Sequence, residues 1–200
     1  MKDAERQQQL ESPFLPPIEE PQDPTIRQAY DMARKQFGKV HTPLKVFCAR
    51  MPPEFFELFT WMHELSEKLT LPQETVSLIG LRVAGINSCS FCVDIARSFV
   101  IKMGMNEAKF NALEEYHTSP LFTDAERAAL DYVTELTKNK AVNPETFARL
   151  ASYYSGRQIC EIVWLVAIEH LQNMTNIGLN IHSDMLCDIS RKQVMRRSES

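Results

Sequence analysis

Apolar residues recur every three or four positions along most of the chain, which is the spacing of one face of an α-helix. The clearest stretch is residues 54–69, where the spacing starts directly after a proline. Its apolar positions include Phe55, Phe56, Phe59, Met62 and Leu65. Only six glycines occur in 200 residues, too few for an all-β chain with frequent tight turns. The pattern predicts an all-α protein.

Helix start signals divide this pattern into successive helices. Thr123 with Glu126 and Ser155 with Gln158 each have the spacing of a capping box, and Ser88 is a plausible N-cap. The predicted helices are 24–37, 54–69, 72–86, 89–103, 106–116, 123–138, 144–153, 155–172 and a last helix that ends near residue 191.

Two of these segments, 75–86 and 162–171, are apolar on nearly every face. A helix of this kind has to be covered on all sides. One bundle of this size has difficulty covering two such helices, so we expect a homo-oligomer, either a trimer or a hexamer built from dimers. The alternative is a single compact bundle with two central helices.

Charge and composition exclude several functional classes. The chain carries 22 basic and 26 acidic residues, a net charge of −4, which argues against a strongly basic nucleic-acid binder. No apolar run approaches 18 residues, and the N-terminus lacks the apolar segment of a secretory signal. We therefore expect a cytoplasmic protein with neither nucleic-acid nor membrane partners, whose five cysteines are thiols and not a disulfide framework.

The strongest chemical signal is the pair Cys89 and Cys92, three residues apart at a predicted helix start. Two such thiols can form a disulfide across the first turn, and the helix N-terminus lowers a thiol pKa. The alternatives are half of a zinc site or two inert thiols. A zinc site needs two further ligands, but the remaining cysteines are solitary and the five histidines show no paired spacing. We expect redox chemistry without a metal or a cofactor.

A weak internal repeat accompanies this motif at an offset of 84 residues. Residues 77–92 and 161–176 each contain a nearly all-apolar helix, a polar break and a pair of residues three apart that starts a new helix. In the second copy the pair is Asn173 and Asn176. Chance is the alternative, because identity is slight, but the matched polarity favours two similar helical units, one reactive and one structural.

The predicted organisation is an arm, a single helical domain and a tail. Eight of the 11 prolines lie within the first 53 residues, which indicates an extended or disordered start. The segments are an arm at 1–23, a domain at 24–190 with repeat units around 73–103 and 157–188, and a basic polar tail at 191–200.

Three segments follow one another along the chain, LIGLRVAGINSCSFCVDIA, LFTDAERAALDYVTELT and EIVWLVAIEHLQNMTN. In this order they resemble the carboxymuconolactone decarboxylase and alkyl hydroperoxide reductase D superfamily. The resemblance covers roughly residues 40–187 and implies an all-helical, oligomeric fold. In the peroxidase branch it implies that Cys92 attacks the peroxide and that Cys89 resolves it as a disulfide. The helix position alone favours Cys89 as the thiolate, so both assignments stay open.

The sequence departs from this superfamily at the expected proton relay. Ser77, Phe91 and Ala96 stand where the peroxidases have a glutamate and two histidines. The nearest carboxylate on the same predicted helix is Glu74, one turn from the glutamate position, and we hypothesise that it serves as the base. Glu161, at the equivalent position of the second unit, is the next candidate. The alternative is that Glu74 is an ordinary first-turn carboxylate favoured by the helix dipole.

Three functions are compatible with these features. The first is a thiol-dependent peroxidase or dithiol–disulfide oxidoreductase in antioxidant defence, with a small peroxide as substrate and a thiol as electron donor. The second is a cofactor-free decarboxylase or isomerase of a lactone or cyclic acid, and the third is a non-catalytic helical interaction module. Because only the first needs the cysteine pair, the motif favours it.

Overall fold

The computed structural model describes residues 12–198, and within that range it contains helices and no β-strand. The α-helices are α2 Pro24–Phe37, α3 Thr42–Val46, α4 Glu54–Ser66, α5 Gln73–Ile86, α6 Ser90–Lys102, α7 Glu107–Asn111, α8 Asp124–Asn139, α9 Pro144–Ala151, α10 Gly156–Gly178 and α11 Leu186–Ser198. Two 3₁₀ turns occupy Cys48–Arg50 and Leu113–Glu115. The all-α prediction is confirmed.

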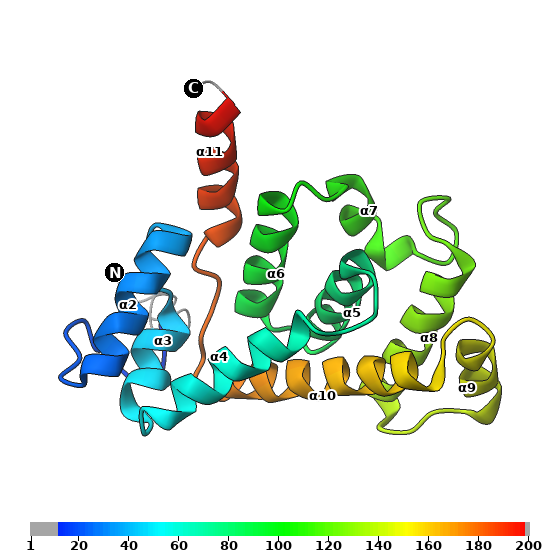
Figure 1. Ribbon diagram of the computed structural model, residues 1–200, viewed down its shortest axis with the longest axis horizontal. Helices are drawn as coiled ribbons and strands as arrows, with labels where there is room; N and C mark the ends of the chain where they lie inside the picture. The colour runs from blue at the N-terminus through cyan, green and yellow to red at the C-terminus, as the bar shows by residue number, and fades with distance from the viewer. Residues whose placement is uncertain (1–11, 199–200) are drawn as a thin grey trace, which may run out of the picture.

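Helix α5 lies at the centre of the molecule and packs against α6, α8 and α10 (Figure 1). The core between α5, α8 and α10 includes Ile79, Val83, Val133 and Ile162, whose side chains are completely buried. A second core forms where α6 begins and α11 packs against it. The start of α6 is therefore surrounded by fixed elements.

Two predicted start signals act as expected, and a carboxylate caps a third helix. Asp23 accepts hydrogen bonds from backbone N–H groups in the first turn of α2. Thr123 with Glu126 and Ser155 with Gln158 form complete capping boxes on α8 and α10. These contacts satisfy N–H groups that have no partner within the helix.

The prediction that Ser88 caps α6 is wrong. Cys89 is the N-cap, and its Sγ accepts the N–H of Cys92 at 3.3 Å. Ser88 instead has φ 59°, in the left-handed region, and turns the chain from α5 into α6.

The expected polar break in the second repeat unit is absent. Helix α10 runs without interruption through Asn173 and Asn176 to Gly178. Both amides are buried and have hydrogen-bond partners on other parts of the chain, so they do not interrupt the helix. No proline or glycine lies between Gly156 and Gly178 to end it.

The two strongly apolar helices differ in how well a single chain covers them. Helix α5 is largely buried, whereas α10 exposes a row of apolar side chains. The exposed apolar residues of α10 include Val163, Trp164, Leu171, Met174 and Ile177. Helix α4 adds Leu58 and Trp61. The expected oligomer would cover these surfaces, and its subunit number stays a prediction.

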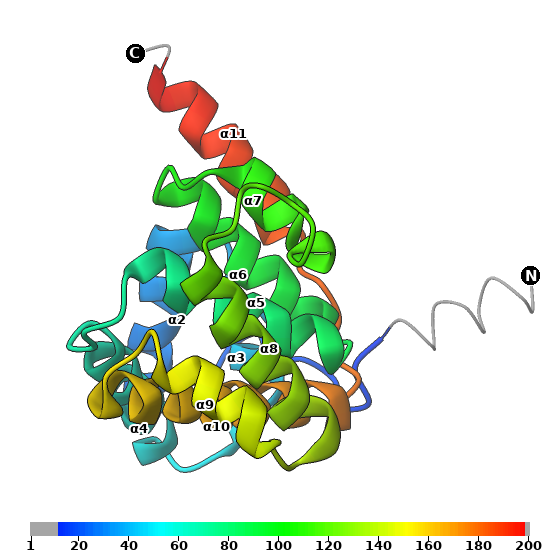
Figure 2. The ribbon, with the colours of Figure 1, turned by 90° about the vertical axis from the view of Figure 1, so that its right-hand side faces the viewer.

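Residues of the predicted arm hydrogen-bond to the helical domain, and the last helix continues into the predicted tail. Residues 1–11 of the arm lie outside the described residues, but the N–H of Phe14 bonds Leu179 O at 3.0 Å and the N–H of Ile18 bonds Lys45 O at 3.1 Å. This part of the arm packs on its own chain. Helix α11 extends to Ser198 instead of ending near residue 191, so the first basic residues of the tail are helical (Figure 2).

No helix among the described residues is both long and apolar enough to cross a membrane.

Candidate functional site

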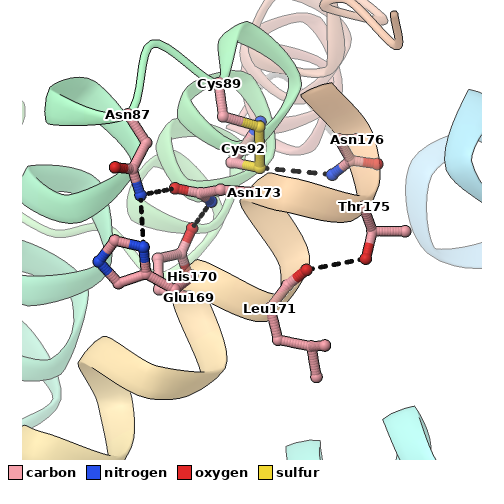
Figure 3. Close-up of a disulfide and its surroundings, with 9 residues drawn as sticks. All are labelled: Asn87, Cys89, Cys92, Glu169, His170, Leu171, Asn173, Thr175 and Asn176. Carbon is pink, nitrogen blue, oxygen red and sulfur yellow. Dashed lines mark hydrogen bonds between the residues drawn. A yellow bond between two sulfur atoms is a disulfide. The ribbon is translucent and has the colours of Figure 1, made fainter. Parts of the chain in front are cut away.

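Cys89 and Cys92 form a disulfide at the N-terminus of α6 (Figure 3). Their Cα atoms are 5.3 Å apart, a separation that disulfides commonly span. The residues are only 1% and 4% exposed, so access to the sulfur atoms is restricted. Phe37, Phe91 and Leu186 belong to the apolar cluster around them.

The cysteine pair lies at a position in the fold that favours thiolate formation. Cys89 precedes the first residue of α6, and Cys92 is the third residue of that helix. The first N–H groups of a helix lack intrahelical partners, and the dipole of the helix is positive at this end. Both features stabilise a thiolate over a thiol, and so lower the thiol pKa.

Each sulfur also has its own hydrogen-bond donor. The backbone N–H of Cys92 donates to Cys89 Sγ at 3.3 Å, and the side-chain Nδ2 of Asn176 donates to Cys92 Sγ at 3.4 Å. Hydrogen bonds to the charged form of a group favour that form. The hydrogen bonds therefore favour the thiolate form at either cysteine and do not decide between the two.

A network of polar side chains lies next to the disulfide, between the end of α5 and the interior of α10 (Figure 3). Asn87 Nδ2 donates to Asn173 Oδ1 at 2.9 Å and lies 3.2 Å from His170 Nδ1. Asn173 Nδ2 in turn donates to Glu169 Oε1 at 2.8 Å. Asn173 is completely buried, and both ends of its amide are satisfied.

Glu169 is the acidic member of this network. Its side chain keeps some exposed surface, but protein atoms surround the carboxyl group, and this desolvation raises its pKa to about 7 despite the hydrogen bond from Asn173. Oε2 lies 3.6 Å from the point where residue 80 would carry a Cβ, and Gly80 has none. The neighbouring His170 has a lowered pKa because of burial and, secondarily, Lys140.

A second histidine, His41, packs against the residue between the two cysteines. Its ring lies 5.8 Å from the ring of Phe91 and 5.8 Å from that of Phe37. Burial lowers its pKa to about 4, so the ring is neutral at pH 7. Nδ1 is enclosed and has no hydrogen-bond partner among the described residues.

Asp94, two residues after Cys92, has a structural role. Its carboxylate accepts the backbone N–H groups of Asp184, Leu186 and Cys187 at 2.9–3.0 Å. These bonds hold the start of α11 against α6. Leu186 is thereby fixed in the apolar cluster around the disulfide.

The structure does not bring Glu74 to the cysteine pair. It lies in the first turn of α5 and forms an ion pair with Lys109, which also bonds Glu126 at 2.6 Å. The pair of cysteines follows the other end of α5, about 18 Å away along the helix axis. This position matches the alternative role of Glu74 as a first-turn carboxylate.

Glu161 is also remote from the disulfide. It accepts hydrogen bonds from Thr70, Leu71 and Arg157. Burial alone would raise its pKa, but these donors outweigh it and lower the pKa. About 22 Å of α10 separates Glu161 from Asn176, the residue that contacts Cys92.

Sequence reasoning missed Glu169, His170, Asn87 and His41, and assigned the asparagines of α10 only a structural role. One signal was available for α10. Glu169, Asn173 and Asn176 follow each other at four and three residues, which puts three polar groups on one face of an otherwise apolar helix. No comparable pattern marks His41.

Within the described range, no group of three or more histidine, cysteine or acidic side chains is arranged to hold a metal ion.

Comparisons with known proteins identify the family. Residues 53–135 match the carboxymuconolactone decarboxylase family. The chain is 30% identical to the uncharacterized protein YnjA of Escherichia coli over 166 residues, which cover 80% of this chain and 88% of YnjA. It is 27% identical to the uncharacterized Bacillus subtilis protein YdfG over 64% of this chain and 88% of YdfG.

Solved structures agree with this assignment. ATU0492 of Agrobacterium tumefaciens, a protein of unknown function provisionally named as the antioxidant defence protein AhpD, superimposes with a TM-score of 0.64 at 26% identity over 69% of this chain and 96% of its own. The debrominase Bmp8 shares the fold, with a TM-score of 0.75 at 20% identity over 89% and 96% of the two chains. The protein belongs to the carboxymuconolactone decarboxylase family, in the superfamily that contains the AhpD-like proteins.

Proposed function

We propose that the protein is a thiol-dependent peroxidase of the dithiol–disulfide type that acts in antioxidant defence. The observation that carries this proposal is the disulfide between Cys89 and Cys92 at the N-terminus of α6. A helix N-terminus stabilises the thiolate that such chemistry needs, and the second thiol is within bonding distance.

The proposed cycle oxidises the two thiols with a peroxide and reduces the resulting disulfide with a donor thiol. A thiolate attacks one oxygen of the peroxide, the O–O bond breaks and a sulfenic acid forms. The other oxygen takes up a proton and leaves as water from hydrogen peroxide or as an alcohol from an organic hydroperoxide. The second thiol attacks the sulfenic sulfur and releases water, which leaves the disulfide. Two molecules of a donor thiol then reduce the disulfide and are themselves joined as a disulfide. The family resemblance favours Cys92 as the attacking residue and Cys89 as the resolving one.

Burial of the pair bears on the substrate. Both sulfur atoms lie among apolar and aromatic side chains and have little exposed surface. A small peroxide fits such a site better than a protein-sized substrate does. The exposed apolar faces of α4 and α10 support a homo-oligomer, for which we propose a trimer or a hexamer.

The test is turnover of hydrogen peroxide and of cumene hydroperoxide with dithiothreitol as donor. We expect Cys92→Ser and Cys89→Ser each to reduce peroxide consumption by at least about 100-fold, because each removes one half of the cycle. Cys48→Ser, which changes a buried thiol outside the motif, is the matched control and should keep the wild-type rate. Wild-type turnover no faster than that of the Cys92→Ser protein would contradict the proposal and favour the decarboxylase or interaction-module alternatives.

A further inference from the structure

Three polar side chains occupy one face of α10 in front of the disulfide. Asn176 contacts Cys92 Sγ directly, Asn173 lies one turn earlier, and Glu169 lies one turn before that. Seven residues separate Glu169 from Asn176, about 10 Å along the axis and only about 20° around it. Glu169 and Asn176, whose amide contacts Cys92, therefore lie on the same side of the helix, two turns apart (Figure 3).

The network gives this carboxyl group a fixed place. Asn173 donates to Oε1 of Glu169, and the oxygen of the same amide accepts from Asn87, two residues before Cys89. The missing side chain of Gly80 leaves space for Oε2 against α5. No basic side chain within the described residues forms an ion pair with Glu169.

We propose that Glu169 is a positioning residue that controls the ionisation of the cysteine pair. When its carboxyl group is protonated, the thiolate forms readily; when it is ionised, its negative charge opposes a second negative charge on sulfur. This inference deepens the proposed function, since it assigns a regulator to the same two thiols.

Coulomb's law sets the size of the effect. Two unit charges about 10 Å apart, in a medium with an effective dielectric constant of about 20, shift each other's pKa by about one unit. Because burial raises the pKa of Glu169 to about 7, this mutual influence acts near neutral pH. Thiol and carboxylate then titrate as a coupled pair, in which one proton moves from sulfur to Glu169 through solvent and no electron is transferred.

Two histidines and one carboxylate lie near the network or the cysteine pair. His170 adjoins Asn87, and burial, followed by the charge of Lys140 at the end of α8, lowers its pKa, which favours the neutral ring. His41, against Phe91 of α6, is neutral as well. Asp94 of α6 is bound to the backbone at the start of α11.

The experiment is the rate at which iodoacetamide alkylates Cys89 and Cys92 in the fully reduced protein between pH 5 and 9.5, read by peptide mass mapping. The wild type should show a two-step profile. Glu169→Gln retains an oxygen for Asn173 and should show one step, with its midpoint about one pH unit lower. At pH 8 its alkylation should be several-fold faster.

Two further variants separate this effect from a change of structure. Glu169→Asp keeps a carboxyl group and should retain the two-step profile, while Glu74→Gln removes a distant carboxylate and should match the wild type. An unchanged profile in a Glu169→Gln protein with wild-type thermal unfolding would overturn the inference, as would the same shift in Glu74→Gln. Because alkylation needs no peroxide, a failure of the proposed function would appear in the turnover assay alone.

Discussion

The start of α6 and the interior of α10 carry the same arrangement of two residues three apart, with opposite consequences. At α6 the pair is Cys89 and Cys92, and it lies where backbone N–H groups are free and the helix dipole is positive. In α10 the pair is Asn173 and Asn176, inside an unbroken helix whose N–H groups are already bonded. A helix N-terminus favours a charged thiolate at the first pair, whereas the amides of the second pair have side-chain hydrogen-bond partners, including Cys92 itself.

Two carboxylates of α10 also differ, because their surroundings shift their pKa values in opposite directions. Glu161 is surrounded by donors from Thr70, Leu71 and Arg157, which lower its pKa against the effect of burial. Glu169, two turns later, has one amide donor and a desolvated carboxyl group, which raises its pKa to about 7. Donors stabilise the charged form at the first site, and their scarcity favours the neutral form at the second.

The largest expected effect is on how the free energy of unfolding changes with pH, and its sign is opposite for the two carboxylates. Between the ordinary pKa of 4.5 and about 7, the folded protein keeps a proton on Glu169 that the unfolded chain has lost, so this residue lowers stability as pH rises. The free energy of unfolding of Glu169→Gln minus that of wild type should therefore increase by about 2–3 kcal/mol from pH 4 to pH 8.

Glu161→Gln should change in the other direction. Its folded-state pKa is depressed, so its contribution is present above the unfolded pKa and is lost as pH falls through the folded one. Urea unfolding of the oxidised proteins at both pH values measures the two differences. Parallel pH dependence in wild type and Glu169→Gln would show that Glu169 titrates normally.

The second prediction concerns the interior amide. Asn173→Ala leaves Asn87 and Glu169 without their partner in a buried site, which should cost about 2 kcal/mol of unfolding free energy. The neighbouring Gln172→Ala is the control and should change stability by less than about 0.5 kcal/mol. Equal effects of the two substitutions in urea unfolding would mean that the network adds nothing to stability.

The smallest effect is expected at the direct contact with sulfur. Asn176→Ala removes the side-chain donor to Cys92 Sγ, which should raise the pKa of that thiol and slow its alkylation at pH 7 by about five-fold. Alkylation of Cys48 in the unfolded protein provides the reference for intrinsic thiol reactivity. A rate for Cys92 equal to or above that of wild type would remove Asn176 from the site.

The sequence was sufficient for the helices and for the cysteine pair, because caps, apolar spacing and the three-residue separation are local signals. It was misleading for the second unit, where two asparagines resembled a helix break. Their amides are satisfied by Glu169, Asn87 and Cys92, and these partners become visible only once α5, α6 and α10 are packed. Helix position alone suggested Glu74 as the base near the cysteines. Glu169 could not be recognised in this way, because its link to the cysteine pair depends on the same long-range contacts.

In the proposed function, Cys89 and Cys92 are a reversible redox pair distinct from the other three thiols. The most direct test of this pairing is peptide mapping, with a thiol count, of the reduced protein before and after one equivalent of hydrogen peroxide. We predict that two thiols are lost, that the Cys89–Cys92 disulfide is the dominant product, that Cys48, Cys160 and Cys187 stay reduced, and that dithiothreitol restores all five thiols. A dominant disulfide between any other pair, or a Cys89–Cys92 pair that stays reduced, would contradict the claim.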